Sequence, residues 1–178
     1  MTDLMPESDL PKRSMVCRVK PGNDEGVFYL RPYTPADADA AIALWLVTWQ
    51  KTYPKVDFAA RLEWWREHWR KLTQAAKIVV AADGRGGNSE TMVGFVTIEP
   101  ATHYLDQLVV APDYWGKAVG LALVEEAKRL AGDFIDLDVN TDNARALGFY
   151  RKCGFVITGD GINSLSGRPI HHLRWRRA

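Results

Sequence analysis

The residues most suggestive of chemistry lie where an apolar strand, 105–110, is followed by a proline and by a helix that begins with small residues. The small residues at the expected start of that helix are Gly116, Ala118 and Gly120. The first backbone N–H groups of a helix have no intrahelical acceptor, and the helix dipole gives this end a partial positive charge. Small side chains let a ligand come close to these N–H groups, so the segment suits a pyrophosphate.

A single carboxylate, that of Asp106, interrupts the apolar strand. Strict alternation predicts that Leu108 shares its face and that Leu105 and Val109 lie on the opposite one. A carboxylate in a sheet is costly to bury unless it is hydrogen-bonded, so we interpret Asp106 as a general base or as an anchor for a substrate amine. The alternative is that it only bonds a neighbouring loop or positions a cationic substrate. The other candidate bases in this region are Glu99 and His103.

The hydrophobic periodicity predicts one domain with the element order β-α-α-β-β-β-α-β-α-β-β. The expected strands are 27–31, 77–82, 92–99, 105–110, 134–139, 155–158 and 170–175, and the expected helices are 35–50, 57–72, 115–130 and 142–152. Thr34 and Pro35 are typical of a helix start, and the glycine-rich turn 83–88 predicts a hairpin. A hairpin meander with helical crossovers implies an α/β fold, with a mixed sheet and helices on both faces.

Residues 1–26 carry prolines and charges without a clear period, so we expect an N-terminal tail or arm followed by a domain over 27–178. The chain has 178 residues, 47% of them hydrophobic, with 23 Lys and Arg against 22 Asp and Glu. This balance provides no basic field for a nucleic-acid partner. Cys17 and Cys153 lie far apart without Cys-x-x-Cys spacing, which argues against a disulfide framework or a metal site.

The N-terminus lacks an apolar signal segment, and no run approaches the roughly 18 to 20 apolar residues of a membrane span. We therefore expect a soluble, cytoplasmic protein without a membrane partner.

Two familiar phosphate-binding motifs do not fit the start of the helix after strand 105–110. A P-loop needs a Lys and a Ser or Thr after its last glycine, but Lys117 precedes Gly120. A dinucleotide-binding fold needs G-x-G-x-x-G after its first strand, whereas this loop comes in the middle of the chain.

The remaining phosphate-bearing ligand is coenzyme A. The segment from Leu105 to Gly120 resembles motif A of the GNAT (Gcn5-related N-acetyltransferase) family, in which [Q/R]-x-x-G-x-[G/A] follows a strand ending in V-x-P. Trp115 and Ala118 depart from it, since they stand where Gln or Arg and the first Gly are usual. The segment 143–155 resembles a second family pattern, N-x-x-A-x-x-x-Y-x-K-x-G-F. The resemblance covers about 27–174 and implies a GNAT-like fold with a central, mostly antiparallel twisted sheet.

The resemblance also implies an activity, transfer of an acetyl group from acetyl-CoA to a primary amine, and roles for residues. Tyr150 is expected to donate its hydroxyl proton to the departing sulfur, and Asp106 is similar to the proposed base of some aminoglycoside acetyltransferases. The strand 105–110 is expected to splay from the next one, with the Val110 N–H meeting the oxyanion and Asn143 contacting pantetheine. The expected acetyl-CoA-binding residues are Leu108, Val109, Val110, Trp115, Gly116, Lys117, Ala118, Val119, Gly120, Leu121, Asn143 and Tyr150.

The acceptor is expected to be a small-molecule amine or a peptide, bound beside the first two helices. Those helices are rich in aromatic residues, whose faces attract a cation. Trp49, Tyr53 and Trp64 are the expected acceptor contacts, whereas Trp45, Trp65 and Trp69 are expected in the core.

Cys153 is expected to be a buried packing residue and not a nucleophile. We therefore expect direct transfer in a ternary complex, without a covalent intermediate. Homodimers are frequent in the family. The alternatives are a non-catalytic acyl-CoA-binding or sensing module and a transferase for a longer acyl group.

Overall fold

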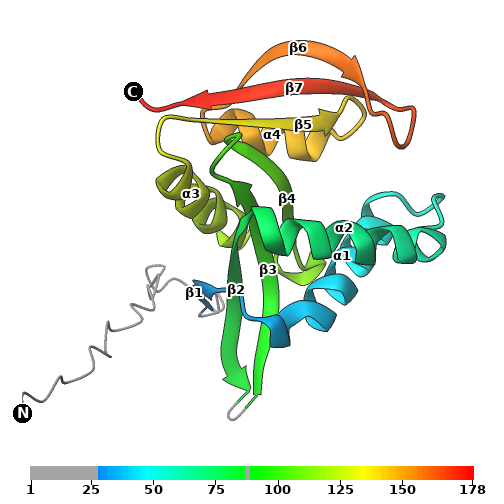
Figure 1. The fold of residues 1–178 in the computed structure, drawn as a ribbon, viewed down its shortest axis with the longest axis vertical. Coiled ribbons are helices and arrows are strands. Elements are labelled where there is room, and N and C mark those ends of the chain that lie inside the picture. Colours follow the sequence, from blue (N-terminus) through cyan, green and yellow to red (C-terminus); the bar gives the residue numbers. More distant parts are fainter. Residues whose placement is uncertain (1–27, 87–88) are drawn as a thin grey trace, which may run out of the picture.

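Seven strands of the described chain form one sheet in the order β1-β2-β3-β4-β5-β7-β6 (Figure 1). The computed structural model describes residues 28–86 and 89–178, and the expected tail, 1–26, lies outside them. The strands are β1 (Phe28–Pro32), β2 (Lys77–Gly86), β3 (Ser89–Glu99), β4 (Tyr104–Val110), β5 (Phe134–Asn140), β6 (Val156–Ile162) and β7 (Pro169–Arg176). The helices are α1 (Ala38–Thr52), α2 (Leu62–Ala75), α3 (Val119–Ala131) and α4 (Ala144–Lys152). The predicted element order is confirmed.

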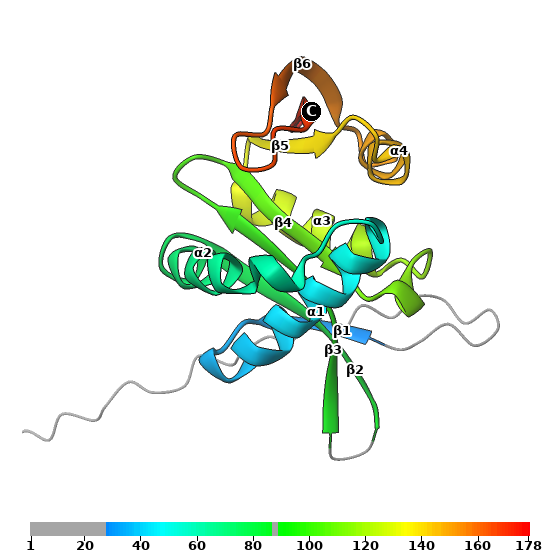
Figure 2. The same cartoon turned by 90° about the vertical axis from the view of Figure 1, so that its right-hand side faces the viewer.

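The sheet is mixed but mostly antiparallel, as expected. Its neighbouring strands run antiparallel except β4 and β5, which are parallel. The predicted hairpin is formed by β2 and β3, although residues 87–88 of its turn lie outside the described residues. The parallel pair divides the sheet into a larger part, β1 to β4, and a smaller one, β5 to β7, which separate in space in Figure 2.

The helices cover the two faces of the sheet and create two cores. Figure 2 shows α1 and α2 on one side of β4 and α3 on the other. The first core lies beneath α3 and α4 and the second beneath α1 and α2. The predicted core tryptophans of the second are buried, with 4% of Trp45, 0% of Trp65 and 3% of Trp69 exposed. Cys153 is buried in the first core, as expected.

The start of α1 is held by a partly buried ion pair. Pro35–Asp37 form a 3-10 turn that precedes the helix, and the Thr34 N–H donates to Asp37 Oδ2 at 2.7 Å. The Arg31 guanidinium reaches both oxygens of Asp37, at 2.8 and 2.7 Å. These hydrogen bonds lower the pKa of Asp37 from 3.8 to about 2, Arg31 having the largest effect. Strand β1 therefore fixes the position of the first helix.

A β-bulge in β4 gives Asp106 a different setting from the one that alternation predicts. Thr97 pairs with Gln107 and Ile98 pairs with Leu105, so Asp106 is the extra residue. The Gln107 N–H donates to the buried hydroxyl of Thr97 at 2.9 Å. This bond holds the bulge in place on the β3 side.

The bulge also changes which side chains share a face. Leu105 and Leu108 pack in the core beneath α3, whereas Val109 packs in the core beneath α1 and α2. Asp106 lies on the same side as Val109, where it contacts α2. Leu105 lies opposite Asp106, as expected, but the expected faces of Leu108 and Val109 are wrong because the extra residue interrupts the alternation.

The sequence pattern predicts that the third helix begins at Trp115. In the structure it begins at Val119. A 3-10 turn covers Pro112–Tyr114, and two residues after it are left-handed, Gly116 at φ 79° and Ala118 at φ 63°. A left-handed residue cannot continue a right-handed helix, and in an alanine this conformation costs about 1 to 2 kcal/mol. The segment 115–118 is therefore a loop.

Candidate active site

Strands β4 and β5 meet at one end and then diverge. Tyr104 pairs with Asp136, and the Asp136 N–H donates to His103 O at 2.9 Å. No second residue pair joins the two strands within 28–86 and 89–178. The expected splay of the strand is confirmed, and we call the space between the diverging strands the β4–β5 opening.

The main chain of β4 presents alternate residues to this opening. The Ala111 N–H donates to Val93 O at 2.8 Å, which makes this a bonded pair of the antiparallel ladder. Bonded and non-bonded pairs alternate, so the main-chain groups of Leu108 and Val110 face the opening while those of Val109 face β3. A ligand that paired with β4 as an extra strand would therefore use Leu108 and Val110.

The loop between β4 and α3 has the amides that an anion site requires. The N–H groups of Trp115 and Lys117 each donate to a carbonyl of the preceding turn at 3.2 Å, and Ala122 gives the first bond of the helix, to Ala118 O at 3.0 Å. Within the described chain, the loop and helix amides without a main-chain acceptor are those of Gly116, Ala118, Val119, Gly120 and Leu121. They lie at the positive end of α3, where a phosphate group is stabilised.

The two glycines of this segment serve different purposes. A Cβ at Gly116 would meet nothing within 4 Å, so this glycine is required by its φ of 79° and not by lack of space. A Cβ at Gly120 would lie 3.3 Å from Phe149 Cζ on α4. Gly120 therefore lets α3 and α4 approach each other, in addition to keeping the helix start open.

Trp115, which departs from the family motif, is held against the opening by its indole. Its Nε1 donates to Val110 O at 2.8 Å, and the Thr48 hydroxyl reaches the same carbonyl at 3.4 Å. The guanidinium of Arg145 lies 3.3 Å from the centroid of the Trp115 ring, and its Nη2 donates to Thr52 Oγ1 at 3.3 Å. A cation from α4 thus sits beside the loop where the family motif has its own polar side chain. Lys117 adds a second one, 5.3 Å above the Tyr114 ring.

Tyr150 lies in the core beneath α3 and α4, with edge-to-face contacts at 5.3 Å to Phe149 and to Phe155. Burial raises its pKa well above the usual range for a phenol. Its hydroxyl forms no hydrogen bond to another described residue, so the proton of this neutral phenol is available to a ligand. Asn143 precedes the same helix and accepts from the Ala146 N–H at 3.2 Å, which confirms it as the N-cap.

Asp106 forms a pair with a histidine that the sequence analysis did not single out. His68 Nε2 lies 2.9 Å from Asp106 Oδ1, and Gln107 Nε2 donates to the same oxygen at 2.8 Å. The His68 ring stacks on Trp64 with centroids 5.1 Å apart and planes 9° apart. Both members of the pair are partly accessible, with 27% of the His68 and 25% of the Asp106 side chain exposed.

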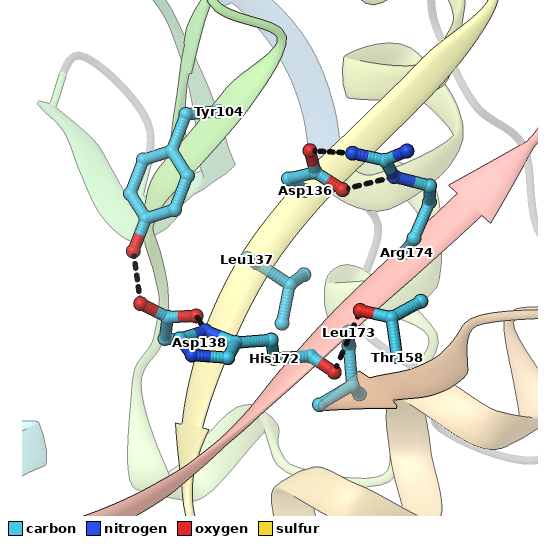
Figure 3. A pocket seen from close by; sticks show the side chains of 8 residues that line it. All are labelled: Tyr104, Asp136, Leu137, Asp138, Thr158, His172, Leu173 and Arg174. Atoms are coloured by element: carbon cyan, nitrogen blue, oxygen red, sulfur yellow. Dashed lines mark hydrogen bonds and ion pairs between the residues drawn. The ribbon is translucent and has the colours of Figure 1, made fainter. Parts of the chain in front are cut away.

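A cavity of about 410 Å³ is lined by Tyr104 of β4 and by residues of β5, β6 and β7 (Figure 3). The Tyr104 hydroxyl donates to Asp138 Oδ2 at 3.1 Å, and Asp138 Oδ1 bonds His172 Nδ1 at 2.6 Å. Burial raises the pKa of Tyr104 well above its usual range, and the charges of Asp138 and Asp106 raise it further. Tyr104 therefore lines the cavity and lies within the electrostatic influence of Asp106. The remaining carboxylate, Asp136, is neutralised by Arg174 through bonds of 2.6 and 2.5 Å.

The β4–β5 opening is thus flanked by a loop with amides that lack a main-chain acceptor in the described chain, and by the contact between Asp106 and His68. The sequence matches the acetyltransferase (GNAT) family over residues 38–155, which is more than half of the chain. The chain belongs to the GNAT acetyltransferase family. It is therefore an acyltransferase, and its mixed sheet with flanking helices is the GNAT fold.

The relatives of this GNAT acetyltransferase include a peptidyl-lysine N-acetyltransferase of Escherichia coli, YjaB. It is 29% identical over 143 residues, which cover 80% of this chain and 92% of that protein. The solution structure of apo-form YjaB aligns with a TM-score of 0.67 at 27% identity, over 85% of this chain and 99% of that one. PaiA N-acetyltransferase from Thermoplasma acidophilum in complex with coenzyme A has the same TM-score at 18% identity, over 84% and 99%, which supports the fold alone.

The expected acceptor residues of this GNAT acetyltransferase lie along α1 and α2. Trp49 is half-buried and stacks on Tyr53 at 5.9 Å. The Tyr53 hydroxyl bonds Asn140 and Asp142, both at 3.1 Å, and so connects the end of α1 to the end of β5. Trp64 is 41% exposed next to His68. Trp64 therefore lies beside the Asp106 pair, whereas Trp49 and Tyr53 lie at the end of α1.

Of the two other candidate bases, Glu99 is the last residue of β3 and His103 lies in the turn that leads to β4. Glu99 accepts from the Thr102 hydroxyl at 2.9 Å. The His103 ring stacks on Phe134 at 4.2 Å, and its buried Nδ1 has no hydrogen-bond partner in the described part of the chain. His103 thus packs against β5. Asp106 is the candidate base whose carboxylate reaches α2.

The sequence analysis missed His68, Tyr104, Asp138, His172 and Arg145. Each is a polar residue with an ordinary place on its own helix or strand, and no local pattern singles it out. Their partners come from other elements, so only the assembled sheet brings them together. In the described ranges, 28–86 and 89–178, no group of three or more His, Cys, Asp or Glu could hold a metal ion. No helix in these ranges is long and apolar enough to cross a membrane.

Proposed function

We propose that this enzyme transfers the acetyl group of acetyl-CoA to the amine of a lysine side chain in a peptide, by direct attack in a ternary complex. The observation that carries the proposal is the β4–β5 opening, with the amides of the β4–α3 loop on one side and Asp106 on the other. The Escherichia coli relative is named as a peptidyl-lysine N-acetyltransferase, which supports this acceptor. The match to the acetyltransferase (GNAT) family over residues 38–155 supports acetyl-CoA as the donor.

The donor side is proposed to bind acetyl-CoA mainly through main-chain groups. The amides of Gly116 and of 118–121 suit the diphosphate, since they combine unsatisfied N–H donors with the positive end of a helix. The main-chain groups of Leu108 face the opening and suit the pantetheine arm, and Asn143, the N-cap of α4, is proposed to contact the same arm. Arg145 provides the cation that Trp115 cannot provide, because it is held on the indole face.

The acceptor side is proposed to prepare the amine for attack. Only about one lysine ammonium in a thousand has lost its proton at pH 7, so a base near Asp106 accelerates the reaction. The Val110 N–H faces the opening and is proposed to stabilise the oxyanion of the tetrahedral intermediate. Tyr150 is proposed to protonate the departing thiolate, since burial keeps its phenol neutral. Acetyl-CoA itself supplies the activated acyl group as a thioester.

Thiol release from acetyl-CoA tests this proposal directly. We expect release with lysine-containing peptides and slower release with polyamines, amino acids and aminoglycosides. Coenzyme A binding, measured by calorimetry, should be detectable without any acceptor. Binding without turnover across the panel would instead indicate a sensing module, and faster turnover with propionyl or succinyl donors would indicate a transferase for longer acyl groups. Absence of binding would contradict the proposal altogether.

A further inference from the structure

The proposed function, on which this inference rests, calls for a base near Asp106. The contact between Asp106 and His68 identifies which side chain that base is. We propose that His68 takes up the proton of the acceptor amine and that Asp106 is the residue that positions it. Nothing about α2 identifies His68 from the sequence. The contact crosses 38 positions of the chain and joins a helix to the bulge of a central strand.

The geometry of the pair determines which nitrogen is basic. An ionised carboxylate can only accept hydrogen bonds, so the hydrogen between Asp106 Oδ1 and His68 Nε2 belongs to the imidazole. A neutral ring with its hydrogen on Nε2 has its lone pair on Nδ1. His68 Nδ1 forms no hydrogen bond to another described residue, and 27% of the side chain is exposed. The basic nitrogen is therefore open to substrate or to a single water.

Asp106 is better placed to hold the ring than to act alone. Its Oδ1 already accepts bonds from His68 and from Gln107, at 2.9 and 2.8 Å. The bulge fixes its backbone through the bond from Gln107 N–H to Thr97 Oγ1, and the Trp64 ring fixes the plane of the imidazole. A carboxylate binds protons only near pH 4, whereas an imidazole exchanges them in the neutral range that amine deprotonation needs.

The proton step balances without a further reactant. An N–H bond of the acceptor ammonium breaks, and its electron pair stays on the amine nitrogen for attack on the thioester. The proton forms a new N–H bond at His68 Nδ1, directly or through one water, and the ring becomes an imidazolium. The charge of Asp106 stabilises that imidazolium, and the exposed edge of the ring then returns the proton to solvent.

The other charged groups around the ring do not replace Asp106. From β4, Tyr104 lies next to Asp106 and donates to Asp138 of β5. On α2 itself, Glu67 forms ion pairs with Arg70 at 2.6 Å and with Lys71 at 3.9 Å. Asp106 is the carboxylate in hydrogen-bond contact with the ring.

The pH profile of acetyl transfer to a lysine peptide tests the proposal. We expect His68→Asn to lower kcat by about 10² to 10⁴ with little change in KM, and to remove the fall in rate on the acidic side of the profile. Asp106→Asn should show a similar loss. Imidazole added to His68→Ala should restore part of the rate, which a purely structural role would not allow. An unchanged rate and profile in His68→Asn, with Asp106→Asn inactive, would overturn the proposal.

The matched control is His171→Asn on β7. His171 Nδ1 contacts Asp160 of β6 at 2.5 Å, so this variant removes a second His–Asp contact, between two strands that β5 separates from β4. It should keep the wild-type rate and profile.

A second measurement does not depend on turnover. Nitrogen NMR of the imidazole should show the Nε2–H tautomer of neutral His68 in the wild-type protein and its loss in Asp106→Asn. The same tautomers in both proteins would overturn the positioning role of Asp106. If the tautomer changes as expected but no amine is acetylated by the wild type, the proposed function fails while the pair stands.

Discussion

The two sides of the β4–β5 opening are built in different ways. The donor side is a continuous segment, 108–121. In it the main-chain groups of Leu108 and Val110 face the opening, and the amides of Gly116 and of 118–121 have no main-chain acceptor in the described chain. The acceptor side is built from side chains of separate elements, and its contacts join residues far apart in the sequence. His68 and Asp106 are 38 positions apart, and Asp138 is 34 positions from Tyr104 and from His172. One side therefore depends on backbone conformation and the other on the identity of single side chains.

Both departures from the family motif lie on the donor side, where the backbone keeps a conformation with amides that lack main-chain acceptors in the described chain. Ala118 stands where a glycine is usual, but it adopts the left-handed conformation and leaves its amide free of a main-chain acceptor in the described structure. Trp115 stands where a polar side chain is usual, but Arg145 stacks on it. On the acceptor side no such replacement is available, because each carboxylate has a specific partner. Substitutions there should cost more activity.

The largest effect is expected at Tyr150, the proposed proton donor. Tyr150→Phe removes the proton donor, so kcat should fall by about 10² to 10⁴ while coenzyme A affinity changes little. Burial raises the pKa of Tyr150, so the phenol stays protonated above its usual range. Ionisation of this residue should therefore cause no loss of rate between about pH 7 and pH 10. Pre-steady-state thiol release measures the chemical step, and an undiminished rate in the variant would exclude this role.

The second effect concerns α1, a helix of the acceptor side, and the stability that the ion pair at its start provides. Asp37→Asn removes the ion pair that holds the start of α1 and should lower the free energy of unfolding by about 2 kcal/mol at pH 7. Because the pKa of Asp37 is lowered from 3.8 to about 2, this stability is present above pH 3.8 and is lost as the pH falls toward 2. Denaturation by urea at several pH values measures the difference.

The exposed Asp39, in the first turn of the same helix, provides the control for this effect. Asp39→Asn should change stability little at any pH. A cost of Asp37→Asn that stayed constant down to pH 2 would contradict the ion-pair explanation.

A smaller effect is expected where a side chain contributes to the donor side. Arg145→Ala should weaken coenzyme A binding about tenfold, or about 1.4 kcal/mol, because it removes the cation stacked on Trp115. Calorimetry at low and high salt measures the loss, which should shrink at high salt as screening increases. Arg151→Ala, an exposed cation on the same helix, should leave the affinity unchanged. Equal losses in both variants would point to a general charge effect.

The smallest effect tests the backbone of the donor loop. Ala118→Gly relieves a left-handed alanine that costs about 1 to 2 kcal/mol, offset by about 0.4 to 1 kcal/mol of added freedom in the unfolded chain. We expect a gain of up to about 1 kcal/mol in unfolding free energy and unchanged coenzyme A affinity. Ala122→Gly, inside α3, should instead lose about 0.5 to 1 kcal/mol. A loss of stability in Ala118→Gly would refute the strain.

The sequence alone determined the order of the elements, the small residues that precede α3 and the start of α4 after Asn143. These features depend on local patterns: the small residues before α3, the N-cap at Asn143 and the apolar period of each strand and helix. It did not determine the bulge at Asp106 or the start of α3 at Val119, because one extra residue and one left-handed alanine leave no signal in an apolar pattern.

Only the tertiary structure decided the acceptor side. The contacts of Asp106 with His68, of Tyr104 with Asp138 and of Arg145 with Trp115 exist because α2, β4, β5 and α4 meet around one opening. Side chains so far apart in the chain carry no shared local pattern. Their chemistry arises from the packing of helices on a sheet that divides between β4 and β5.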